Sequence, residues 1–323
     1  MDIAKRSVSS VLQAANEGFG DRRTYPTGFG ILDRSIGGGL RSRNLTLVGG
    51  APGVGKTIAT LQWARNLAVA GVPSVFACYE HDEATLLSRL LHLELGEMPA
   101  KDRMAEDGRA ARRVLGEVDS GAKSLAEAAR DLPILAELQR RVSEYAPHLW
   151  LVQASGSNTT VEQLAKLVGP DTGVLFVDYL QKVPVTAEFV EERERVITVS
   201  QGLKELAMES NVSVVAVTAA DLGGMEAPRL RLHHLRGSSA LAYEADVVIL
   251  LNDKFKIVSK SQMSFSPNSV EGFKRQIVFT IEKNRNGPDR VDLEFGKQYE
   301  YLRVDPEGGY VTDRLIDDRL ITE

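Results

Sequence analysis

The stretch NLTLVGGAPGVGKT, from Asn44 to Thr57, decides the fold. An apolar strand runs into a glycine-rich turn, and a helix follows from Gly55 to Ala70, which is the context that a phosphate-binding loop requires. Glycines let the backbone curl so that successive N–H groups face an anion, and the helix N-terminus adds a favourable dipole. The sequence therefore predicts that a nucleoside triphosphate is bound by Gly50, Ala51, Pro52, Gly53, Val54, Gly55, Lys56, Thr57 and Ile58.

The rest of the chain continues this alternation of strand and helix. Short apolar strands are expected near 74–79, 148–153, 173–178, 212–218 and 246–251, with helical segments between them. Strands joined by helices form parallel sheets whose two faces are covered. Residues 275–303 instead show short alternating segments joined by turns. We therefore expect an α/β fold with a mostly parallel central sheet covered by helices and with antiparallel strands at the C-terminal edge.

Composition bounds the class of protein. The 323 residues carry a net charge of −5 and a pI near 5.7, so the overall charge does not indicate a nucleic-acid partner. The single cysteine, Cys78, allows neither a disulfide framework nor a cysteine-ligated zinc site. The first ten residues lack the apolar core of a signal peptide, and no apolar run reaches the ~18 residues of a membrane span. We expect a cytoplasmic protein without a membrane partner.

Three regions are expected along the chain. Residues 1–23 contain a helix over 7–18, which packs either on its own domain or on a neighbouring subunit. Residues 24–303 form the nucleotide-binding domain, in which 97–147 are an elaboration of two or three helices. Residues 304–323 form a charged C-terminal tail. The apolar face of the first helix carries Val8, Val11, Leu12 and Ala15.

Four side chains near the loop suit phosphoryl transfer. Lys56 would neutralise the β- and γ-phosphates of ATP, and Thr57 would ligate Mg²⁺. The strand GVLFVD ends in Asp178, whose carboxylate can hold the water shell of this Mg²⁺, although an aspartate at a strand end can also be a cap. Glu80 ends another strand, which we expect next to the strand of the loop, where it could orient the attacking water. The alternative for Glu80 is a solvated strand terminus.

Two cations precede a tight turn in the segment EKNRNGP, residues 282–288. Lys283 and Arg285 are two residues apart, so on a strand they point to the same side. One interpretation is a surface hairpin. The other is an arginine finger, which stabilises the γ-phosphate bound by a neighbouring subunit and contributes ~10³-fold or more to the rate.

These motifs in this order resemble the motor domain of DnaB-type replicative helicases, over residues 24–303. The resemblance also includes PTGFGILDRSIGGGL before the loop, FVDYLQ, the helix after it, and LRGSSALAYEADVVILL. It implies a RecA-like P-loop NTPase fold and a homo-oligomer, usually a ring of six subunits, with a filament as the other form. ATP and Mg²⁺ would lie between subunits. Lys56, Thr57, Glu80 and Asp178 would come from one subunit and Lys283 and Arg285 from the next, with 7–18 as a linker helix.

The chain departs from the family's pattern at three places. The N-terminal domain of replicative members, which carries their primase contacts, is expected to be missing. The strand over 212–217 ends in Thr218, Ala219 and Ala220, where family helicases usually have a glutamine that links the γ-phosphate to the DNA-binding loops. The loop over 219–236 is only mildly basic. Its candidates for contact with single-stranded DNA are Arg229, Arg231 and Arg236, and the alternative is a solvated loop.

These observations favour an ATP-dependent, helicase-type motor that hydrolyses Mg-ATP at subunit interfaces and binds single-stranded DNA. One alternative is a nucleotide-gated assembly ATPase that acts on a protein partner without unwinding. The other is a recombination-type, branch-migration ATPase.

Overall fold

The computed structural model describes residues 5–16, 18, 22–186, 191–259 and 269–316. A ten-stranded sheet crosses the described part in the order β11-β10-β9-β8-β3-β7-β6-β4-β5, with β12 paired to β10. A separate ribbon pairs β1 (Thr24–Tyr25) with β2 (Leu40–Arg41). The parallel strands are β3 (Leu45–Gly50), β4 (Ser74–Cys78), β5 (Leu149–Gln153), β6 (Val174–Asp178), β7 (Ser213–Ala219) and β8 (Val247–Asp253).

The antiparallel strands are gathered at the C-terminal edge: β9 (Gln276–Asn284), β10 (Val291–Gln298), β11 (Arg303–Val304) and β12 (Gly309–Tyr310). This confirms the predicted fold class. The prediction that the strand before Glu80 lies next to the loop strand is wrong, because β7 and β6 lie between β4 and β3.

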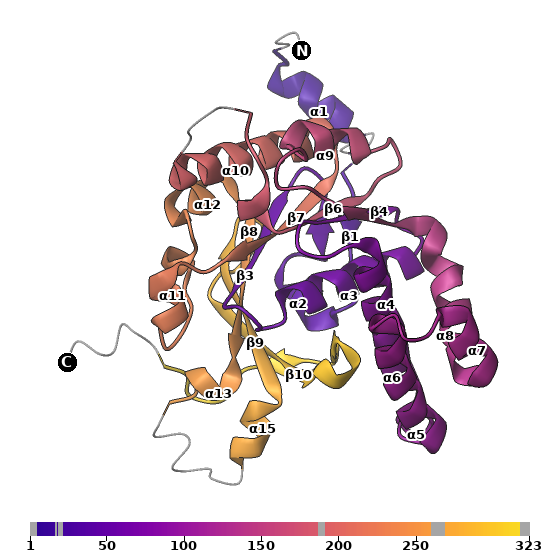
Figure 1. Cartoon of the computed structure of the whole chain (residues 1–323). Helices are drawn as coiled ribbons and strands as arrows, with labels where there is room; N and C mark the ends of the chain where they lie inside the picture. The colour runs from indigo at the N-terminus through magenta and orange to yellow at the C-terminus, as the bar shows by residue number, and fades with distance from the viewer. Residues whose placement is uncertain (1–4, 17, 19–21, 187–190, 260–268, 317–323) are drawn as a thin grey trace.

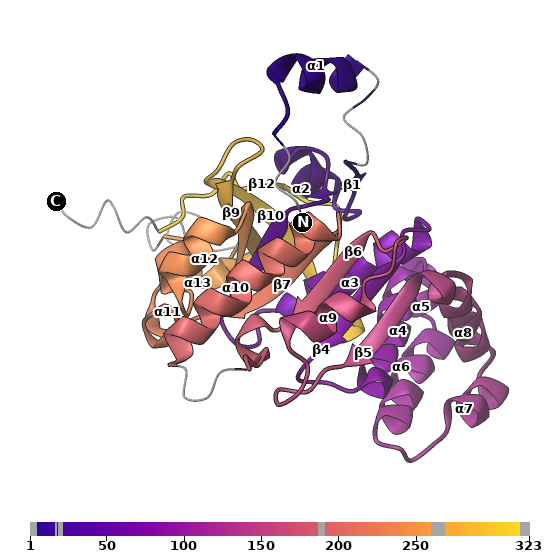
Figure 2. The same ribbon diagram turned by 90° about the horizontal axis from the view of Figure 1, so that it is seen from above.

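Helices cover both faces of the sheet (Figures 1 and 2). One face carries α2 (Gly30–Ser35), α3 (Lys56–Val69) and α4 (Glu83–Glu97). The other carries α9 (Val161–Leu167), α10 (Glu192–Glu209) and α12 (Ser238–Glu244). Two shorter helices follow the C-terminal ends of strands, α11 (Leu222–Glu226) after β7 and α13 (Lys254–Ile257) after β8, and α15 (Val270–Lys274) precedes β9.

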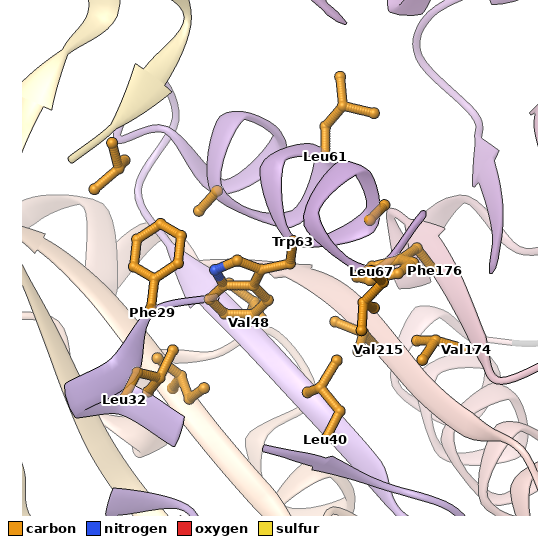
Figure 3. Close-up of a cluster of buried hydrophobic side chains, with 14 of the residues drawn as sticks. Phe29, Leu32, Leu40, Val48, Leu61, Trp63, Leu67, Val174, Phe176 and Val215 are labelled. Atoms are coloured by element: carbon orange, nitrogen blue, oxygen red, sulfur yellow. The ribbon is translucent and has the colours of Figure 1, made fainter. Parts of the chain in front are cut away.

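The core has one layer on each face of the sheet, since successive strand residues point to opposite faces. On β3, Leu47 belongs to the layer under α10 and Val48 to the layer under α3. Figure 3 shows Trp63 of α3 in this second layer beside Phe29 and Val48. Its ring is fully buried and meets Phe29 and Phe279 edge to face, with centroids 6.2 Å apart in each pair.

The helical elaboration has its own small core. It comprises four described helices rather than two or three: α5 (Ala100–Arg103), α6 (Glu106–Asp119), α7 (Leu125–Asp131) and α8 (Pro133–Tyr145). Leu115, Leu135 and Leu138 are fully buried where these helices pack against Leu91 and Leu95 of α4. The elaboration therefore stands on the helix that follows Glu80.

The helix α1 (Val8–Asn16) contributes no buried residue. The exposed fraction is 86% for Val8 and 63% for Leu12, so the apolar face of α1 has no cover within the described chain.

The segment after β12 packs back on the domain. Asp313 forms an ion pair with the buried Lys254, and Leu315 forms a β-bridge with Val258. The remainder of the expected linker (1–4, 17 and 19–21) and of the tail (317–323) lies outside the described residues.

Candidate functional site

The loop after β3 has the backbone of a phosphate cradle. Gly53 and Gly55 have φ of 74° and 100°, in the left-handed region that side chains disfavour, and Gly55 caps α3. A Cβ on Gly55 would lie 2.3 Å from the hydroxyl oxygen of Tyr299. That hydroxyl donates to the Val54 carbonyl at 2.6 Å, so Tyr299 braces the loop from the antiparallel edge. No pattern in the sequence indicated this role.

The ammonium group of Lys56 lies against the same loop. Its Nζ donates to the carbonyl oxygens of Gly50 and Ala51 at 2.9 and 3.0 Å. Burial lowers the pKa of Lys56, while Asp178 and Glu80 act in the opposite direction. The cation is therefore held where the phosphates of a nucleotide in this loop would lie.

Thr57 and Asp178 meet beside the loop. The Thr57 hydroxyl donates to Asp178 Oδ2 at 2.6 Å, and the carboxylate is only 2% exposed. Burial raises the pKa of Asp178 to about 6, the Thr57 hydrogen bond opposes the rise, and nearby Glu80 adds to it. A hydroxyl and a carboxylate are hard oxygen ligands, which fits a Mg²⁺ ion that takes its other ligands from phosphates and water. No cluster of three or more His, Cys, Asp or Glu side chains with metal-ligand spacing occurs among the described residues.

Glu80 reaches this group through the pairing of β4 with β6. Cys78 is in register with Asp178, and Glu80 follows two residues later. A cavity of about 380 Å³ has among its lining residues Gly55, Lys56, Thr57, Glu80, His81, Arg89, Asp178 and Ala219. The structure thus brings the predicted lysine, threonine and two carboxylates together.

Arg89 was not predicted. It lies two turns into α4, and its Nη2 is 2.9 Å from His81 Nε2. The sequence signal that could have identified Arg89 is its position two helical turns after the strand end that carries Glu80. At that position its side chain lies on the helix face that points back toward the end of the strand.

Lys283 and Arg285 lie away from this cavity. Lys283 pairs with Val248 on β8, and Arg285 donates its backbone N–H to the Asp246 carbonyl, so both lie where the parallel strands begin. The cavity lies where those strands end. Lys283 Nζ donates to two carbonyls at the end of α12, and Arg285 Nη1 donates to Asp246 Oδ1 at 3.2 Å. The described chain does not bring either cation to its own phosphate loop.

The three predicted DNA-binding arginines have different surroundings. Arg229 is 4% exposed and pairs with Asp292 at 2.5 Å, so its guanidinium holds the fold together and is not available to DNA, contrary to the prediction. Arg231 is half-buried and pairs with Glu282 at 2.7 Å. Arg236 is half exposed and pairs with Glu192 on α10.

Gln181 contacts the segment that lacks the family's glutamine. Its Nε2 donates to the Thr218 hydroxyl at 2.7 Å, and its Oε1 accepts from the Ala219 N–H at 3.2 Å. These bonds tie the chain after β6 to the end of β7. The sequence motif FVDYLQ contains Gln181, but its partner could not be read from the motif.

The strand, glycine loop and helix, with a carboxylate from β6 beside the loop threonine, define the class of P-loop nucleotide-binding domains on a mostly parallel sheet. The family model described as DnaB-like helicase C terminal domain matches residues 24–303. The chain therefore belongs to the DnaB-like helicase C-terminal domain family.

Individual proteins show the same likeness. The chain is 27% identical over 275 residues to the replicative DNA helicase DnaB of Treponema pallidum, covering 83% of this chain and 53% of that protein. To the replicative DNA helicase DnaB of Geobacillus stearothermophilus it is 28% identical over 291 residues, covering 87% of this chain and 56% of that protein. It thus spans about half the length of the curated relatives that it matches.

A solved structure of a DnaB-like replicative helicase and its interactions with primase aligns with TM-score 0.70 and 20% identity. It covers 94% of this chain and 67% of that one. At this identity the structural likeness establishes the fold.

Within the part of the chain that the structure describes, no helix is long and apolar enough to cross a membrane.

Proposed function

We propose that this chain is the motor subunit of a ring or filament that hydrolyses Mg-ATP at the seams between subunits and binds single-stranded DNA. The observation that carries the proposal is the placement of the two half-sites. Lys56, Thr57, Glu80 and Asp178 surround the cavity at one end of the parallel strands, while Lys283 and Arg285 lie at the other end. A second copy must supply the missing half.

Each residue then has a role in phosphoryl transfer. The loop N–H groups and Lys56 bind the phosphates of ATP, and Thr57 and Asp178 hold the Mg²⁺ that neutralises charge on them. Glu80 accepts a hydrogen bond from the attacking water and orients it toward the γ-phosphorus. Arg285 of the adjoining copy stabilises the charge that develops on the transferred phosphoryl group. Binding and orientation supply most of the rate enhancement.

The exposed face of α1 supports assembly. An isolated helix of nine residues is marginal in water, and α1 buries none of its side chains within the described chain. Docking of Val8 and Leu12 on an adjoining copy would remove them from water. The curated relative from Treponema pallidum is named as a replicative DNA helicase, and one solved DnaB-like helicase is described together with its interactions with primase.

A second candidate is an assembly ATPase that acts on a protein partner without unwinding DNA. It is favoured by the engagement of Arg229 and Arg231 in ion pairs, which leaves the loop over 219–236 with little free positive charge. Phosphate contacts supply most of the affinity for nucleic acids, so such a loop binds DNA weakly.

The experiment measures phosphate release from Mg-ATP against protein concentration, with and without an oligo(dT) strand. We expect specific activity to rise with concentration as seams form, and to rise further with oligo(dT). EDTA should abolish it. A monomer by sedimentation that hydrolyses ATP at full rate would refute the seam, and absence of any oligo(dT) effect or binding would select the assembly ATPase.

A further inference from the structure

A second polar cavity, which we call the basic cavity, lies where the parallel strands begin. Its volume is about 250 Å³, well above the ~15 Å³ that one water molecule needs. Its lining contains five cations, Arg22, Arg23, Arg41, Arg43 and Lys204, together with the amides of Asn44 and Asn286. Among the described residues, no acidic side chain lines it.

The fold fixes the backbone of the segments that carry these cations. Arg23 and Ser42 exchange hydrogen bonds, with Arg23 N donating to Ser42 Oγ at 3.0 Å and Ser42 N donating to the Arg23 carbonyl at 2.9 Å. The ribbon of β1 and β2 continues this pairing with Thr24 opposite Arg41. Lys204 of α10 donates to the Arg43 carbonyl at 2.8 Å. A fixed backbone lowers the ordering cost of bringing these side chains onto an anion.

Two donors at the cavity have no protein partner. Arg41 Nε and Asn286 Nδ2 are buried and make no hydrogen bond among the described residues. Buried donors are nearly always satisfied in native proteins, so each such group needs an explanation. Both residues line the basic cavity, so a ligand there would lie beside these two side chains.

The nearby charge is also unbalanced. None of the arginines that line the cavity forms an ion pair within the described chain, whereas many arginines elsewhere do. Asp246, an acid close by, is only 6% exposed and already accepts from Lys204 at 2.7 Å, from Arg285, and from the Leu45 N–H. An anion with several oxygen atoms is the ligand that this arrangement favours.

We propose that the basic cavity binds a phosphate group. Guanidinium groups bind phosphate through paired N–H donors, and the excess of cations matches a group with more charge and more acceptors than a carboxylate. The phosphate comes either from the backbone of a nucleic-acid strand or from a free polyphosphate. This site goes beyond the ATP cavity, which lies at the other end of the strands. It adjoins the predicted finger, because Lys204 and Arg285 share Asp246.

Arginine footprinting on the unmodified full chain tests the site. Mg-ADP is kept present throughout to fill the phosphate loop, and phenylglyoxal modification of each arginine is measured by peptide mass spectrometry. We expect a several-fold protection of Arg41 and Arg43 by oligo(dT), by inorganic tripolyphosphate, or by both. The pair Arg112 and Arg113 on α6 should be unprotected. Protection by only one probe identifies the source of the phosphate, and protection by neither overturns the proposal.

Salt dependence of oligo(dT) binding gives a second test. The double variant R41A/R43A is compared with R112A/R113A, which removes the same charge from α6. If two backbone phosphates are lost, the slope of log K against log salt falls by ~1.4, since each contact contributes ~0.7 for a single strand. An unchanged slope with tripolyphosphate protection assigns a free anion, and an unchanged slope without protection refutes the site. The rate of ATP hydrolysis without DNA should be equal in both variants. A failure of the proposed ATPase would appear in this rate, and a failure of the phosphate site would appear in oligo(dT) binding.

Discussion

Mixing two inactive variants tests whether each active site is shared between two chains. Lys56→Ala removes the phosphate-loop cation and keeps the finger, whereas Arg285→Ala removes the finger and keeps the loop. Arg285 bonds to the carbonyl of Asp246, five residues before Leu251, which pairs with Gly50. At ~3.3 Å per residue this is ~16 Å along the strand, more than an arginine side chain spans. Arg285 therefore cannot serve its own chain's nucleotide.

The magnitude follows from the geometry of the seam. Loss of the finger should lower hydrolysis by ~10³-fold, which corresponds to about 4 kcal/mol of transition-state stabilisation. In a random equal mixture about a quarter of the seams combine an intact loop with an intact finger from the next chain, because the head-to-tail interface repeats around the assembly. Activity should therefore recover to about 250 times that of the Arg285→Ala protein alone.

The assay is phosphate release from Mg-ATP after the two proteins are mixed, unfolded together and refolded, so that the subunits exchange. Arg290→Ala, which removes an exposed arginine of the same hairpin, is the control and should keep the parent's rate. Fluorescent nucleotide should bind Arg285→Ala nearly as tightly as the parent. If the mixture stays as inactive as its components while it forms normal oligomers, then the two halves do not act across a seam.

Three further changes test the cavity and the fold. Glu80→Gln should abolish hydrolysis while nucleotide titration shows nearly unchanged binding, and a variant that still turns over at the parent's rate would exclude Glu80 as the water-orienting group. Because the pKa of Asp178 is about 6, its carboxyl is protonated below that pH and cannot ligate Mg²⁺. The Mg²⁺ concentration for half-maximal activity should therefore rise as the pH falls from ~7 to ~5.5. A Mg²⁺ requirement that does not change with pH would contradict this role of Asp178. Glu94 is fully buried and pairs with Arg65 at 2.6 Å. Glu94→Ala should therefore lower the free energy of unfolding by ~3–5 kcal/mol, which corresponds to a fall of ~4–7 °C in Tm by calorimetry for a chain of this length. The control Glu137→Ala, at an exposed ion pair, should leave Tm unchanged.

The local parts of the site could be predicted because neighbouring residues determine them. The loop glycines and the start of the helix at Lys56 follow from the sequence between Gly50 and Thr57 alone. Strand order does not follow, because a crossover helix can return the chain to either side of a strand. Glu80 was therefore assigned to the correct cavity for the wrong reason. It arrives beside Asp178 through β4 and β6 and not beside the loop strand.

Long-range pairs explain the errors in the DNA-binding candidates. Arg229 looks like a loop cation in the sequence, but its partner Asp292 lies 63 residues away on β10. Charge alone does not reveal whether a side chain points to solvent or to a distant carboxylate. The same limit hid Tyr299, which reaches the carbonyl of Val54 from 245 residues away. Such contacts exist only after the sheet has formed.

The segment after β7 shows how the structure changes the interpretation of a missing residue. Thr218, Ala219 and Ala220 stand where the family resemblance leads us to expect a glutamine, and Ala219 lines the cavity beside the phosphate loop. Gln181 binds Thr218 and Ala219, and its Nε2 lies 3.4 Å from the Arg236 carbonyl at the far end of the same loop. A shift of β6 on nucleotide binding would therefore act on both ends of this loop through one amide. A hydrogen-bonded connection between the chain after β6 and this loop thus exists although Thr218, Ala219 and Ala220 include no glutamine.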